Sequence, residues 1–142
     1  MSNPYIELKR KHQREINAFP LGFAYNMDQF NEMMAKWNLT SDDVDKIYRI
    51  DIGTYLRKCD SEAFHELLER HTKEIETART ENKDDYLYHM FNYELANHEY
   101  NYTGELDDTL DALGLTLEEI EANPIMDEAL KRAIKNQQDI DW

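Results

Sequence analysis

Apolar residues recur at helical spacing along most of the chain, so the sequence predicts a mainly helical protein. The clearest helix covers residues 61–81, where one face carries Phe64, Leu67, Leu68, His71, Ile75 and Ala78. The opposite face of this helix, with Glu62, His65, Glu69 and Glu76, is expected to be solvated.

Further helices are expected over residues 4–17, 27–38, 85–99 and 125–137, with shorter ones over 105–113 and from Thr116. The helix over residues 27–38 has an apolar stripe of Phe30, Met33, Met34 and Trp37 and is expected to end at a left-handed Asn38, and the helix over 85–99 has an inner face of Leu87, Met90, Phe91 and Leu95. Thr116 and Glu119 have the spacing of a capping box, which supports a helix start at this point.

The remaining segments predict a small amount of β-structure and several turns. Residues 47–57 are rich in β-branched and aromatic types around Asp51-Ile-Gly53, which is typical of a hairpin. Residues 19–25 contain proline and glycine and are expected to form a loop or short strand, and residues 100–104 a loop. Thr40 and Asp43 predict the start of a third short helix. The expected fold is mainly α (α+β), a compact bundle of about six helices with one small β-hairpin, in a single domain over residues 1–142.

Charge is distributed unevenly along this pattern. Residues 1–83 contain 15 acids and 13 bases, whereas residues 84–142 contain 15 acids and 3 bases, so most of the net charge of −14 lies in the second part. Residues 84–130 contain no lysine or arginine, and the basic cluster Lys9, Arg10, Lys11 and Arg14 lies near the other end. An acidic chain is repelled by phosphates, so we expect no direct binding to nucleic acid or to an anionic membrane. The favoured partner is the basic cleft of a protein that handles nucleic acid.

The predicted partner-binding residues are acids of the cation-free stretch together with two neighbouring tyrosines, which suit interfaces because the ring packs and the hydroxyl bonds. The full set is Asp84, Asp85, Glu94, Glu99, Tyr100, Tyr102, Glu105, Asp107, Asp108, Asp111, Glu118, Glu119 and Glu121.

The sequence contains no complete catalytic or cofactor motif. Its four glycines are scattered, which excludes a phosphate loop and a dinucleotide fingerprint. Glu62-x-x-His65 is a single step of a pattern that di-iron bundles use twice, and Glu69 stands where the metalloprotease helix needs histidine. Cys59 lies near a helix start but has no nucleophile signature around it, so we interpret it as a small hydrophobic residue. We therefore expect no catalytic residue, no cofactor and no metal site.

Two histidines keep alternative interpretations open. His71 lies on the apolar face of its helix. The simplest interpretation is a histidine at the edge of the core that bonds to backbone or to a carboxylate, and the alternative is a catalytic base. Glu94 and His98 are one helical turn apart and could pair or bind a metal ion. The helix turn at Leu113-Gly-Leu-Thr116 resembles that of a DNA reader, but the following helix carries glutamates that phosphates would repel.

Several segments are similar to one family. The blocks Glu94-Leu-Ala-Asn-His-Glu-Tyr-x-Tyr-Thr-Gly104 and Thr109-Leu-Asp-Ala-Leu-Gly-Leu-Thr116, with Phe30-Asn-Glu-Met-Met34 and Ile47-Tyr-Arg-Ile50, resemble uncharacterised small acidic proteins of phages and mobile elements of gut bacteria. The resemblance implies a genomic setting and no assigned activity. With one cysteine and no apolar run long enough to span a bilayer, we expect a cytoplasmic protein.

Three functions are compatible with these features. The first is an acidic inhibitor that occupies a basic cleft as a nucleic-acid mimic, of the anti-CRISPR or another anti-defence type. The second is a non-mimetic protein-interaction adaptor that uses the tyrosine segment, and the third is a small metal-dependent or hydrolytic enzyme built on Glu94, His98 or His71. The oligomeric state is left open.

Overall fold

The computed structural model describes residues 3–139, and the domain predicted over residues 1–142 extends beyond that range at both ends. Within it the fold is mainly α (α+β), as predicted, with eight α-helices and a small three-stranded antiparallel sheet. The helices are α1 (Pro4–Ala18), α2 (Met27–Lys36), α3 (Ser61–Glu81), α4 (Tyr86–Asn97), α5 (Tyr100–Thr103), α6 (Asp107–Leu113), α7 (Leu117–Glu121) and α8 (Pro124–Gln138). The strands are β1 (Gly22–Phe23), β2 (Ile47–Asp51) and β3 (Thr54–Arg57).

Two local predictions are wrong. The segment expected to be a loop over residues 100–104 contains the single-turn helix α5, bracketed by left-handed conformations at Glu99 and Gly104. No α-helix begins at Thr40. The Asp43 carboxylate accepts a hydrogen bond from the Thr40 amide at 2.8 Å, and the Asp43 amide donates to the Thr40 carbonyl, which closes a turn. A 3-10 helix, Val44–Lys46, follows that turn.

The contacts divide the chain into two compact units. The N-terminal unit comprises Lys11–Glu74, and the C-terminal unit comprises Met1–Arg10 and Ile75–Trp142. Helices α1 and α3 each pass from one unit into the other. The prediction of a single domain stays a prediction, and each unit is described by itself.

The N-terminal unit contains the sheet, in the order β1-β3-β2, with α2 packed beside β1. Its buried cluster consists of Ala24, Met33, Met34 and Ile47, with the other predicted α2 stripe residues partly buried around it. Gly22 allows the close approach of helix and strand, since a Cβ atom there would lie 2.4 Å from the Met33 sulfur. The predicted hairpin is confirmed as β2 and β3, which pair with a register shift between Arg49 and Asp51.

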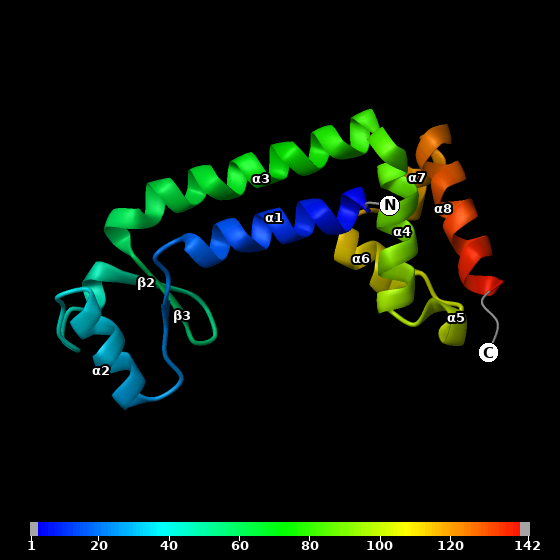
Figure 1. Ribbon diagram of the computed structural model, residues 1–142. Coiled ribbons are helices and arrows are strands. Elements are labelled where there is room, and N and C mark those ends of the chain that lie inside the picture. Colours follow the sequence, from blue (N-terminus) through cyan, green and yellow to red (C-terminus); the bar gives the residue numbers. More distant parts are fainter. Residues whose placement is uncertain (1–2, 140–142) are drawn as a thin grey trace. The chain divides into compact units, whose positions relative to one another are not determined.

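The C-terminal unit is built around α4. The four residues predicted for its inner face, Leu87, Met90, Phe91 and Leu95, are at most 1% exposed. Helix α8 packs along α4 (Figure 1), while α6 and α7 contribute Leu110, Leu113 and Ile120 to the same core. Helix α7 begins with the predicted capping box, in which Thr116 and Glu119 bond each other's backbone amides. No helix in the described part of the chain is both long enough and apolar enough to cross a membrane.

Replacing Thr116 by alanine is expected to lower the free energy of unfolding by about 1 kcal/mol, because the amide at the start of α7 loses its side-chain acceptor. Urea denaturation followed by circular dichroism measures this change. Thr80→Ala, at an exposed position within α3, is the matched control and should leave stability nearly unchanged. Equal stability of the two variants would contradict the role given to the cap.

Candidate functional site

All thirteen predicted partner-binding residues lie in the C-terminal unit, and most of them face solvent. Buried Leu110, Leu113 and Ile120 fix α6 and α7 on the core, which turns the acids of these helices outward. Among the described residues, seven exposed acids of the predicted set form no ion pair: Asp84, Glu99, Glu105, Asp107, Asp108, Asp111 and Glu118. We call these seven residues the open acidic set.

Three further acids of the prediction are partly neutralised by neighbours. Asp85 forms an ion pair with Arg132, whose guanidinium also lies 4.7 Å from the Tyr88 ring centroid. The Glu119 carboxylate accepts hydrogen bonds from the Thr116 amide and from the Thr116 hydroxyl. Glu121 interacts electrostatically with Lys131 and helps to raise the pKa of that lysine. These acids contribute less to an outward negative field than the open acidic set does.

Glu94 is the exception to the predicted surface, because it is only 4% exposed. Its carboxylate accepts a hydrogen bond of 2.5 Å from the Tyr5 hydroxyl and lies 3.5 Å from the Lys9 ammonium. Burial and the adjacent carboxylate raise the pKa of Tyr5 well above its ordinary value, so the hydroxyl stays protonated and donates. Glu94 therefore fastens α1 to α4 inside the unit and cannot contact a partner in this structure.

The two tyrosines of the predicted set differ in their exposure to solvent. Tyr100 is partly buried against the main core, whereas Tyr102 is 72% exposed. Glu94 and His98, the pair that could bind a metal ion, have their nearest carboxylate oxygen and ring nitrogen 3.8 Å apart. The hydrogen bond to Tyr5 and the ion pair with Lys9 engage the Glu94 carboxylate.

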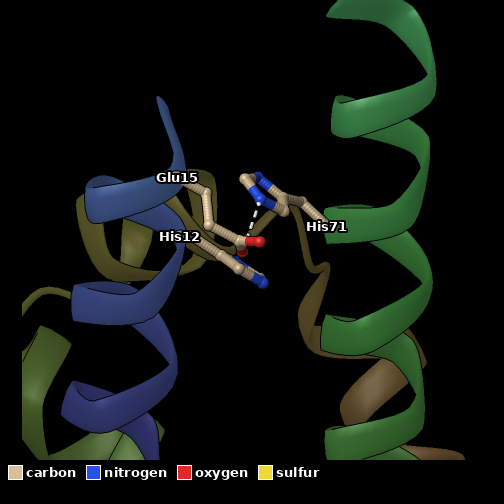
Figure 2. Close-up of side chains that lie close together, drawn as sticks. All are labelled: His12, Glu15 and His71. Atoms are coloured by element: carbon tan, nitrogen blue, oxygen red, sulfur yellow. Dashed lines mark hydrogen bonds and ion pairs between the residues drawn. The ribbon is translucent and has the colours of Figure 1, made fainter. Parts of the chain in front are cut away.

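A second cluster of ionisable side chains lies in the N-terminal unit, where α1 and α3 face each other (Figure 2). His12 and His71 are 9% and 6% exposed, and their rings stack with centroids 3.8 Å apart and planes 16° from parallel. Each ring bonds a carboxylate of the opposite helix: His12 Nε2 lies 2.8 Å from Glu74 and His71 Nε2 lies 3.2 Å from Glu15. We call His12, Glu15, His71 and Glu74 the histidine–glutamate cluster.

Cations complete this cluster from the solvent side. Arg70 bonds Glu15 at 2.6 Å and Glu74 at 3.1 Å, and the Lys11 ammonium lies 3.3 Å from Glu74. The bond from His12, assisted by Lys11 and Arg70, lowers the pKa of Glu74 to about 2, and the Arg70 guanidinium lowers the pKa of Glu15. Both carboxylates are thus ionised at neutral pH.

The sequence reasoning located only part of this cluster. The interpretation of His71 as a core-edge histidine bonded to a carboxylate is confirmed by its contact with Glu15. His12, Glu15 and Glu74 were missed as members of a site. The available signal was the spacing, since His12-x-x-Glu15 and His71-x-x-Glu74 repeat the same step on two helices.

Other predictions about chemistry have mixed outcomes. Glu62, His65, Glu69 and Glu76 are exposed, which confirms that this face of α3 is solvated. Cys59 is also exposed, and its interpretation as a small hydrophobic residue stays a prediction. It lies in a 3-10 helix, Lys58–Asp60, whose position before α3 keeps the thiol outside the apolar cluster.

The N-terminal unit also carries an apolar groove of about 860 Å³ that the sequence reasoning did not find. It runs along strand β2, which is an edge of the sheet, and continues onto α1 and α3. Several large apolar side chains around it are exposed, among them Phe23 at 59%, Tyr48 at 47% and Ile50 at 41%. Exposed apolar patches of this kind are typical of interaction surfaces.

Replacing Tyr5 by phenylalanine is expected to lower the free energy of unfolding by about 1–3 kcal/mol, because buried Glu94 loses its closest donor. Urea denaturation measures the loss. Tyr25→Phe is the control, since that side chain is 73% exposed and its hydroxyl makes no comparable buried bond. A Tyr5→Phe protein as stable as this control would contradict the assignment of Glu94 to an internal bond.

Glu74 should make stability depend on pH in the acidic range. Its pKa is lowered from 4.5 to about 2 in the folded protein, so its contribution is complete above pH 4.5 and lost as pH falls toward 2. The stability difference between the wild type and Glu74→Gln should therefore shrink as melting temperatures are measured from pH 6 down to pH 3. Glu76→Gln, at an exposed position of the same helix, should show no such trend. A difference that is independent of pH would contradict the pairing.

Comparisons with known proteins yield one family. No curated protein and no solved structure matches the chain. A family model described as a family of unknown function (DUF7659) matches residues 4–136, which include both units. The chain therefore belongs to this family of unknown function, DUF7659.

Proposed function

We propose that this protein is a non-enzymatic, protein-binding inhibitor whose acidic surface occupies a basic cleft of another protein. The observation that carries the proposal is the open acidic set, in which seven exposed carboxylates of the C-terminal unit have no cationic partner among the described residues. Unpaired carboxylates create an outward negative field that attracts basic surfaces and accelerates association with them.

The arrangement on α6 suits a cleft that normally holds nucleic acid. Asp107 and Asp108 lie four and three residues before Asp111 on this helix, so the Cβ atom of Asp111 is roughly 5–6 Å from that of each of the other two. One DNA strand carries a charge about every 3.4 Å along its axis. The carboxylates of α6 and α7 together would present negative charges at a comparable spacing. The proposed partner is therefore a nucleic-acid-handling enzyme, such as a defence nuclease of a bacterial host.

The acids of the N-terminal unit provide a contrast. Residues 11–74 contain 12 acids and 9 lysines and arginines, and four of the acids, Glu15, Asp43, Asp60 and Glu74, form ion pairs with these cations. The residues of the C-terminal unit contain 18 acids and 7 lysines and arginines. This larger excess of negative charge supports the C-terminal unit as the contact surface.

The test is capture of partners from bacterial lysate by two tagged variants with equal net charge. The surface variant changes Asp107, Asp108, Asp111 and Glu118 to lysine, and the control variant makes the same change at exposed acids of the N-terminal unit: Asp28, Glu32, Glu62 and Glu69. The wild type and the control should retain a partner at about 50 mM salt and lose it at about 500 mM or on addition of duplex DNA. The surface variant should lose it under all conditions. A partner lost equally from both variants, or retained by both, would contradict the proposal.

A second candidate is a non-mimetic adaptor that uses the groove beside β2. An extended segment of another protein could add along this edge strand and place apolar side chains in the groove lined by Ile16, Tyr48, Ile50 and Phe64. Such binding should resist salt, because apolar contacts are not screened. Tyr48→Glu should then abolish capture while the acidic surface variant retains it. The reverse pattern would favour the inhibitor.

A further inference from the structure

The histidine–glutamate cluster combines ligand types that bind transition metals. One nitrogen from each of His12 and His71 and one carboxylate oxygen from Glu15 lie within 4.8 Å of one another. Figure 2 shows the Glu15 carboxylate beside the two rings, with Glu15 and His12 coming from α1 and His71 from α3. Two imidazoles and one carboxylate form a ligand set that zinc accepts while keeping a position open for water.

We propose that His12, Glu15 and His71 bind a divalent metal ion of the zinc class. Tetrahedral zinc holds its ligand atoms about 3.4 Å apart, so the three donors need to approach one another by at most about 1.4 Å. Rotation about the side-chain torsions of Glu15, His12 and His71 would bring the three donor atoms to this spacing. The Glu15 carboxylate is already ionised, because its pKa is lowered by Arg70.

Glu74 lies beside His12, Glu15 and His71 but is not one of the proposed ligands. Its oxygen is 2.8 Å from His12 Nε2, so metal binding at that nitrogen would replace the present hydrogen bond. Arg70 and Lys11 would continue to pair with the released carboxylate. Glu74 is therefore an outer partner that holds His12 in place when the metal is absent and neutralises the ion when it is bound.

The alternative is that the four side chains only fasten α1 to α3. The bonds run between residues 12 and 74 and between residues 15 and 71, as expected for antiparallel helices joined at two points. One feature exceeds what fastening requires. Each of the two nearly buried rings has a nitrogen within 4.8 Å of the other ring's nitrogen and of a Glu15 oxygen.

Zinc titration of the full chain after treatment with a chelator tests the proposal by calorimetry. The expected result is one ion per chain with a dissociation constant of about 10 μM or lower. His12→Gln, His71→Gln and Glu15→Gln should each weaken binding by more than about 100-fold, the upper end of the effect of losing an outer partner. His65→Gln, at an exposed position of α3, is the matched control and should leave the affinity unchanged.

A second measurement uses the wild-type protein, so a variant that fails to fold cannot affect its result. In the ¹⁵N-labelled wild-type protein, zinc should shift the ring-nitrogen signals of His12 and His71 and leave those of His65, His89 and His98 in place. Binding weaker than about 10 μM, or shifts at the other three histidines instead, would overturn the proposal. The zinc site and the acidic surface lie in different units, so either can fail without the other.

Discussion

A polar or ionised group can be buried only if it is paired, and both units of this chain bury polar groups that obey this constraint. In the C-terminal unit the Glu94 carboxylate lies beneath Tyr5 and Lys9, and this contact attaches the first turns of α1 to α4. In the N-terminal unit two stacked histidines lie between Glu15 and Glu74. Because α1 takes part in both contacts, its charged residues determine how this helix packs in each unit.

The same constraint distinguishes carboxylates that have a partner inside the protein from those that have none. Glu94, Glu15 and Glu74 have donors within hydrogen-bond distance, so their charges are balanced within the protein. The open acidic set has no such donors among the described residues, and its charges remain available to another molecule. The net charge of the chain is −14, and nearly all of the excess of acids over lysines and arginines lies after residue 83.

Local signals in the sequence were sufficient for most helices and for the hairpin. The capping box at Thr116, the inner face of α4 and the left-handed Asn38 each follow from residues close together in the chain. The long-range pairs could not be found in this way, because Tyr5 and Glu94 are 89 residues apart and His12 and Glu74 are 62 apart. Glu94 was accordingly counted as a surface acid, although the packing of α1 on α4 buries it.

The claim that the acids of α6 and α7 contact a partner can be tested most directly by zero-length carbodiimide cross-linking of the captured complex. This reagent joins a carboxylate to a lysine amine only where the two touch, and mass spectrometry then identifies the linked residues. The account predicts links from partner lysines to the acids between Glu105 and Glu118. Links confined to the N-terminal unit, for example to Asp51 beside the groove, would contradict it.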